Sequence, residues 1–91
     1  MTRDPSPQEL IERAYAERLP EFVGMKVEAT RRPDDESIID VMVRVPLLKR
    51  PLRPADVISW SRIAREALEA AGDDRFPSVR SRLAKGQKIA A

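Results

Sequence analysis

The 91-residue chain contains no cysteine and no histidine. Without them it has no disulfide, no thiolate nucleophile, no imidazole for proton transfer and none of the commonest zinc ligands. Its three glycines lie too far apart to form a phosphate-binding loop of either common spacing. Carboxylates remain, but those of Asp34, Asp35 and Glu36 have the composition of an exposed turn. We therefore expect a protein that is not an enzyme and that holds no metal and no cofactor.

Long apolar runs are also missing. No stretch approaches the roughly 20 apolar residues of a membrane span. Residues 1–10 lack the apolar segment of a signal peptide. Together with the absence of cysteine, this predicts a cytoplasmic protein that does not associate with a membrane.

Aromatic residues are few: Tyr15, Phe22, Trp60 and Phe76 make up 4% of the chain. The length allows one domain, residues 1–91, with a thin core that self-association would enlarge. We expect an ordered part from about 7 to 85, flexible tails at 1–5 and 87–91, and a homo-oligomer.

The first predicted element is a helix. Ser6 and Glu9 have the spacing of a capping box, and Pro7 suits the first helical position. The helix is expected to end near Pro20. Its apolar side carries residues at helical spacing: Leu10, Ile11, Ala14, Tyr15 and Leu19.

A hairpin follows, because the apolar period changes to two. Residues 25–30 and 39–45 alternate apolar and polar side chains, and residues 31–37 supply turn formers. Both apolar sets face one side only when Ala29 pairs with Ile39 or with Val41. We expect a five-residue loop that gives one of these registers.

Prolines at 46, 51 and 54 make residues 46–54 an extended connection, with its leucines packed on the domain and its cations in water. A second helix is predicted from Pro54 to about Ala71, with Gly72 in a left-handed cap. Its apolar stripe places Trp60 in the core and Asp56 on the solvent side. Pro77 is expected to begin a short last helix to about Lys85.

These elements predict an α+β fold: a two-layer α-β-β-α domain with a short C-terminal helix, in which two helices pack on one face of an antiparallel hairpin. The second strand is longer than the first. Its overhang at Val43–Val45 would leave an apolar edge that a second copy could pair with.

The charges are unevenly distributed. Residues 1–43 carry six basic and ten acidic side chains, whereas residues 44–91 carry eleven basic and five acidic ones. The basic half could bind an anionic partner or face the glutamates of the first helix. The candidate contacts are Lys49, Arg50, Arg53, Arg75, Arg80, Arg82, Lys85 and Lys88.

Three functions stay open. The first is a small non-catalytic adaptor that binds a protein partner or itself. The second is a nucleic-acid-binding module that uses the basic C-terminal helix and the 47–54 loop. A helix-turn-helix arrangement is disfavoured, because the connection 72–76 is long and carries Asp73 and Asp74. The third is a site built only from carboxylates, which requires two of them in a concave pocket.

Overall fold

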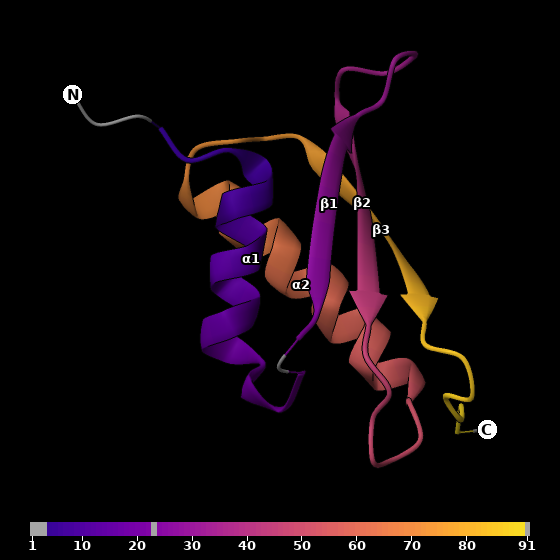
Figure 1. Ribbon diagram of the computed structural model, residues 1–91. Helices are drawn as coiled ribbons and strands as arrows, with labels where there is room; N and C mark the ends of the chain where they lie inside the picture. Colours follow the sequence, from indigo (N-terminus) through magenta and orange to yellow (C-terminus); the bar gives the residue numbers. More distant parts are fainter. Residues whose placement is uncertain (1–3, 23, 91) are drawn as a thin grey trace.

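The computed structural model describes residues 4–22 and 24–90 (Figure 1). The fold is α+β, with two helices and a three-stranded mixed sheet. In chain order the elements are α1 (Pro7–Arg18), the 3-10 turn η1 (Pro20–Phe22), β1 (Lys26–Arg31), β2 (Ile38–Val45), α2 (Pro54–Ala70) and β3 (Phe76–Leu83). None of the helices in this part of the chain has the length and apolar character needed to cross a membrane. Val23, predicted to help close the core, and residues 1–3 and 91 of the predicted tails lie outside the described residues.

Helix α1 begins and ends as predicted. The Ser6 hydroxyl accepts a hydrogen bond of 3.2 Å from the Glu9 amide, and Pro7 is the first helical residue. At the other end the Leu19 amide donates to the Tyr15 carbonyl at 2.8 Å, directly before Pro20. The local capping signals therefore determine both ends of this helix.

Strands β1 and β2 pair antiparallel with Ala29 opposite Val41, the second of the two expected registers. The connection covers residues 32–37 and is one residue longer than expected. This register turns the apolar residues of both strands toward the helices. At the outer edge of β1, the Gln8 side chain of α1 accepts a hydrogen bond of 3.2 Å from the Ala29 amide.

The predicted helix over residues 77–85 is wrong, because this segment forms β3. Strand β3 pairs parallel with β2, so that Val43 lies opposite Ser81 and Val45 opposite Leu83. Pro77 and Val79 turn inward, while Ser78 and Arg80 alternate with them, which is the period of a strand. The overhang of β2 is thus covered by the chain itself. The homo-oligomer was predicted from a free edge of β2, and β3 occupies that edge. A helix-turn-helix arrangement is excluded, because its second helix is a strand.

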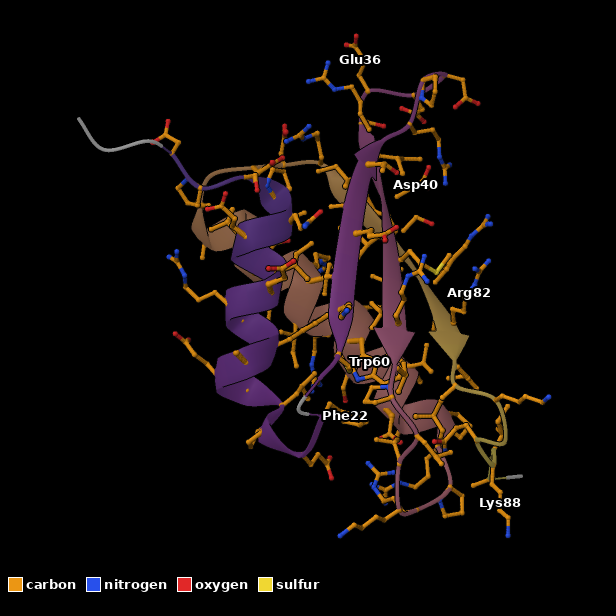
Figure 2. The ribbon with its side chains drawn as sticks, in the orientation of Figure 1. Phe22, Glu36, Asp40, Trp60, Arg82 and Lys88 are labelled. Carbon is orange, nitrogen blue, oxygen red and sulfur yellow. The ribbon has the colours of Figure 1, made fainter. Side chains whose placement is uncertain are left out.

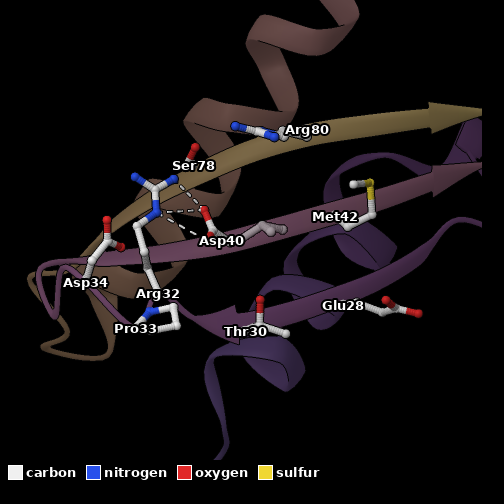
Figure 3. Close-up of a pocket in the computed structure, with 10 residues that line it drawn as sticks. Glu28, Thr30, Arg32, Pro33, Asp34, Asp40, Met42, Ser78 and Arg80 are labelled. Carbon is white, nitrogen blue, oxygen red and sulfur yellow. Dashed lines mark hydrogen bonds and ion pairs between the residues drawn. The ribbon is translucent and has the colours of Figure 1, made fainter.

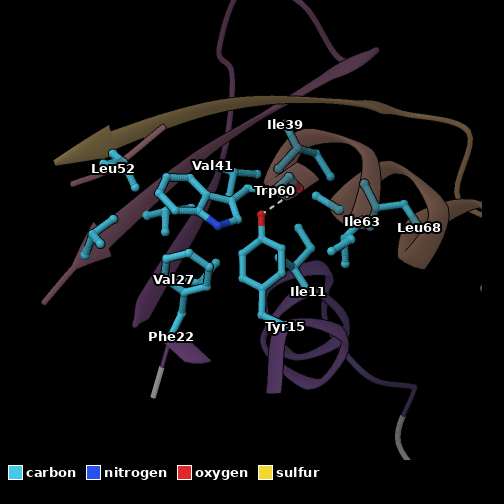
Figure 4. Close-up of a cluster of buried hydrophobic side chains, with 13 residues drawn as sticks. Ile11, Tyr15, Phe22, Val27, Ile39, Val41, Leu52, Trp60, Ile63 and Leu68 are labelled. Atoms are coloured by element: carbon cyan, nitrogen blue, oxygen red, sulfur yellow. Dashed lines mark hydrogen bonds between the residues drawn. The ribbon is translucent and has the colours of Figure 1, made fainter. Parts of the chain in front are cut away.

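Both helices cover one face of the sheet and pack against each other (Figure 1). Trp60 is fully buried, as predicted, and meets the ring of Phe22 edge to face at 5.4 Å between centroids (Figure 4). The Tyr15 hydroxyl donates to the Trp60 carbonyl at 2.9 Å, and burial raises the pKa of Tyr15. The buried core comprises Ile11, Tyr15, Phe22, Val27, Ile39, Val41, Val43, Val45, Leu52, Trp60, Ile63, Ala64 and Leu68.

Two details of the 46–54 connection and of α2 differ from expectation. Leu52 is buried and Leu48 half-buried, but Leu47 is exposed. Asp56 is buried instead of facing solvent, because it binds the first turn of α2 and a neighbouring arginine. Gly72 has the expected positive φ of 80° after α2.

The chain after β3 returns along this connection. The Leu52 amide donates to the Lys88 carbonyl, and the Ala90 amide donates to the Leu52 carbonyl, each at 2.8 Å. The Gln87 side chain accepts from the Leu48 amide at 2.7 Å and donates to the Arg50 carbonyl at 3.1 Å. The two basic segments of the sequence, 47–53 and 84–90, therefore lie side by side at one end of the sheet.

Candidate functional site

The face of the sheet opposite the helices is covered by no described element; we call it the open face (Figure 2). Side chains alternate along a strand, so the residues that do not enter the core point to this face. Figure 2 shows Arg82 on this side, directed away from α1. The open face consists of Lys26, Glu28 and Thr30 from β1, Ile38, Asp40, Met42 and Arg44 from β2, and Phe76, Ser78, Arg80 and Arg82 from β3.

Three cations stand directly opposite one another across the open face. Lys26 pairs with Arg44 in the antiparallel register, and Arg44 pairs with Arg82 in the parallel register. Neighbouring strands lie about 4.8 Å apart, and like charges at opposed positions destabilise a sheet. Arg44 has partial compensation from Glu28, at 3.5 Å, but Lys26 and Arg82 form no ion pair with any described residue. We call these three residues the basic row.

A hollow of about 560 Å³ adjoins the basic row (Figure 3). At its centre Arg32 holds Asp40: one guanidinium nitrogen, Nη2, lies 2.6 Å from Oδ1, and Nε lies 3.2 and 3.3 Å from the two carboxylate oxygens. These hydrogen bonds hold the pKa of Asp40 below its usual range. The lining residues are Glu28, Thr30, Arg32, Pro33, Asp34, Asp40, Val41, Met42, Ser78 and Arg80.

The hollow brings several carboxylates together in a concave place, as a site built from carboxylates would require. Its geometry does not suit general acid catalysis, because Arg32 keeps Asp40 ionised. Within residues 4–22 and 24–90 there is also no group of three or more His, Cys, Asp or Glu side chains placed to hold a metal ion. The hollow offers charged and hydrogen-bonding side chains to a ligand.

The structure divides the eight predicted contact residues into three groups. Arg80 and Arg82 lie on the open face. Lys49, Lys85 and Lys88 belong to the two basic segments that meet at the end of the sheet. None of these five forms an ion pair with the described part of the chain.

The remaining three, Arg50, Arg53 and Arg75, are occupied or distant. Arg50 donates to both oxygens of Asp56 at 2.9 and 3.0 Å and to Glu21 at 3.2 Å. Its guanidinium lies 5.5 Å from the ring centroid of Phe22. Arg53 lies 3.8 Å from Asp56.

Arg75 pairs with Asp73 at 2.6 Å just before β3, at the opposite end of that strand from Lys85. The hydrogen bonds from Arg75 lower the pKa of Asp73. Arg50 and Arg75 therefore serve the fold and are not available as a free charge.

The sequence left open whether the cations of the basic half form ion pairs with the glutamates of the first helix. Glu21, which lies in η1 after that helix, pairs with Arg50, whereas Arg80 and Arg82 lie on the sheet face away from α1 and form no ion pair with it. Ion pairs inside the chain thus involve Arg50, Arg53 and Arg75, and they leave Arg80 and Arg82 of β3 without an ion pair to any described residue.

The prediction missed Lys26 and Arg44, because it grouped cations by position in the chain instead of by face. The alternation of residues 25–30 already placed Lys26 opposite to the core side. What the pattern could not supply was the parallel pairing of β3, which brings Arg82 beside Arg44.

The fold and this face define a small α+β domain with a cationic sheet surface. The chain matches no known family model, and no curated protein or solved structure is significantly similar to it. Its function is therefore argued from the surface itself.

Proposed function

We propose that the protein is a non-catalytic nucleic-acid-binding module whose open face takes the phosphodiester backbone along the basic row. The observation that carries this proposal is the alignment of Lys26, Arg44 and Arg82 across three adjacent strands. Such a row costs folding stability, and an anionic ligand would relieve the repulsion. A chain of phosphates is the ligand that matches a line of cations, because each cation can displace one condensed counterion.

Further cations extend this surface. Arg80 lies two residues before Arg82 on the same face of β3. Beyond the end of β3, Lys85 and Lys88 continue the chain toward Lys49. None of these four side chains is neutralised by a described carboxylate at salt-bridge distance. The surface is thus larger than the basic row, which supports several phosphate contacts. A cytoplasmic location, expected from the lack of cysteine, is part of this proposal.

The test is the binding of labelled oligonucleotides, measured by fluorescence anisotropy at about 50 and about 200 mM salt. The double variant R44Q/R82Q removes two charges of the row. We expect its affinity to fall at least tenfold at the lower salt. The slope of log K against log salt should become shallower by about 1.4, since each contact to a single strand contributes about 0.7.

The matched control is Arg62→Gln, an exposed arginine of α2 on the helical layer. Its affinity and salt dependence should equal those of the original chain. The proposal fails if no oligonucleotide binds at about 50 mM salt, or if the double variant and Arg62→Gln bind equally well.

A second candidate, the adaptor function, is favoured by the outer edge of β3. The Phe76 amide donates to the carbonyl of Ser37, directly before β2, and the Ala84 amide donates to that of Val45. In a parallel pair the amides between them alternate in direction. Val79, Ser81 and Leu83 therefore direct their amides outward, where no described strand pairs with them. A protein partner could add a strand there. Two copies joined through β3 would place Arg80 and Arg82 of both chains together, so an acidic partner fits this edge better than a second copy.

A further inference from the structure

We infer that the hollow beside the basic row binds an unpaired base of a single-stranded nucleic acid and prefers bases that carry an amino group. This inference rests on the proposed function, because the basic row must hold the backbone of the same strand. It adds a site and a ligand class that the charge argument alone does not supply.

The hollow lies within reach of a strand that is bound along the basic row. The register places Glu28, Met42 and Arg80 in one row across the sheet, two residues along the strands from the basic row. The next row holds Thr30, Asp40 and Ser78. Two residues of a strand span about 6.6 Å. A base attached to a sugar above the basic row therefore reaches the hollow without moving its phosphate.

The charges of the hollow differ from those of the basic row. The hollow contains three carboxylates, Glu28, Asp34 and Asp40, and two guanidinium groups, Arg32 and Arg80, whereas the basic row contains cations alone. Arg32 is held by Asp40, so the part of the hollow away from Arg80 is unfavourable for a phosphate. A strand with a negative backbone and neutral bases matches this division. Its phosphates lie on the row and its bases in the hollow. An acidic peptide matches it less well, because its acidic side chains in the hollow would meet three carboxylates and only two guanidinium groups, one of them already held by Asp40.

The hydrogen-bonding groups of the hollow distinguish one base from another. A carboxylate accepts hydrogen bonds and cannot donate them when ionised, and it has about four acceptor positions. Arg32 occupies part of this capacity, and the Asp40 side chain keeps 39% of its surface exposed. The exocyclic amino group of cytosine, adenine or guanine offers two N–H donors to a carboxylate, whereas thymine presents a carbonyl oxygen at the corresponding position and can donate only its single ring N3–H. Asp40 therefore favours amino-bearing bases, with Met42 beside it as an apolar contact for the ring.

The width of the open face favours a single strand over a duplex. A major groove about 12 Å wide admits one helix or a two-stranded ribbon. The open face is three strands wide, and the whole molecule measures 41 × 31 × 19 Å, with a layer of helices behind the sheet. It cannot enter a groove to reach base edges. A duplex would make phosphate contacts alone, whereas a single strand can place its bases on the sheet.

The experiment compares oligo(dC), oligo(dT) and a mixed duplex of equal length at about 100 mM salt, again by anisotropy. We expect oligo(dC) to bind at least about fivefold more tightly than oligo(dT), since a good bidentate base contact discriminates against the wrong base by at least this factor. In Asp40→Asn the amide both donates and accepts, so this preference should fall to near one. Arg82→Gln should weaken both single strands and keep their ratio.

Glu36→Gln is the matched control, because Glu36 is exposed in the 32–37 connection before β2 and does not line the hollow. A measurement on the unmodified chain guards against a folding defect in Asp40→Asn. In NMR spectra oligo(dC) should shift the Met42 methyl and the Asp40 and Ser78 amides more than oligo(dT) does.

The outcomes separate the two proposals. If no oligonucleotide binds, the proposed function fails. If binding depends on Arg82 but oligo(dC) and oligo(dT) bind equally, if Asp40→Asn keeps the preference, or if the duplex binds as tightly as oligo(dC), the base site is refuted and the proposed function stands. Displacement by polyglutamate at the same charge concentration as oligo(dC) would overturn both in favour of an acidic protein partner.

Discussion

Asp56 stabilises the fold although it is the one buried carboxylate of the described chain. It accepts a hydrogen bond of 2.8 Å from the Arg53 amide and two from Arg50. Replacing it with asparagine should lower the free energy of unfolding at pH 7 by about 1–2 kcal/mol, because hydrogen bonds to a charged group are lost and Glu21 becomes the one carboxylate that pairs with Arg50. Urea denaturation measures this difference.

The difference should also depend on pH with a definite sign. The hydrogen bonds from Arg50 lower the pKa of Asp56 in the folded chain. Its stabilising contribution is therefore complete above the unfolded pKa of about 3.9 and is lost as the pH falls through the lower folded value. Glu36→Gln, an exposed control, should match the original chain throughout. A difference that stays constant as the pH is lowered through this range would assign the effect to packing instead of charge.

The element that tests the fold most directly is β3. Its even-numbered amides donate to β2 and its odd-numbered amides face outward, as the hydrogen bonds of Phe76 to Ser37 and of Ala84 to Val45 establish. Amide hydrogen exchange should therefore show slow exchange at residues 78, 80 and 82 and fast exchange at 79, 81 and 83. A helix over the same residues would protect consecutive amides. Continuous protection from residue 81 onward would contradict the strand.

Elements with local signals could be predicted from the sequence, and β3 could not. Ser6 with Glu9 determines where α1 begins, and the requirement that Ala29 face the core leaves two registers for the hairpin, one of which is observed. Pro77 is equally compatible with an edge strand, where its missing amide falls on the side that pairs with no described strand. What decides is the free edge of β2, a partner more than thirty residues earlier in the chain. A two-residue apolar period in so short a segment does not reveal such a partner.

The candidate site was predictable to a similar degree. Arg80 and Arg82 were among the expected contacts, since they are cations of the basic half. The sequence could not show that Arg50 is held by Asp56, because their contact arises from the path of the 46–54 connection. It also could not show the hollow, which needs Arg32 from the loop, Asp40 from β2 and Ser78 from β3 together.

At the scale of the whole molecule, the charge asymmetry of the sequence becomes an asymmetry along the sheet. Figure 2 shows Glu36 at one end of the molecule and Lys88 at the other. The turn with Asp34 and Asp35 joins the carboxylate end, and the two basic segments form the opposite end. The basic row lies nearer to the cationic end, because it pairs the first residue of β1 with the last residues of β2 and β3. A polyanion approaching the open face would thus be oriented before it makes contact.

The basic row also implies an exchange of stability for binding. In Arg82→Gln one of three opposed cations is removed, so the free energy of unfolding should rise by about 0.2–0.5 kcal/mol at low salt. The gain should vanish near 1 M salt, where the screening length falls to about 3 Å, below the separation of the charges. Arg62→Gln should show no such gain at either salt concentration. Urea denaturation at both salts, beside the oligonucleotide affinity of the same samples, measures the two effects together. If Arg82→Gln destabilises the chain at low salt, the row is not a source of repulsion, and the reason for assigning it an anionic ligand is removed.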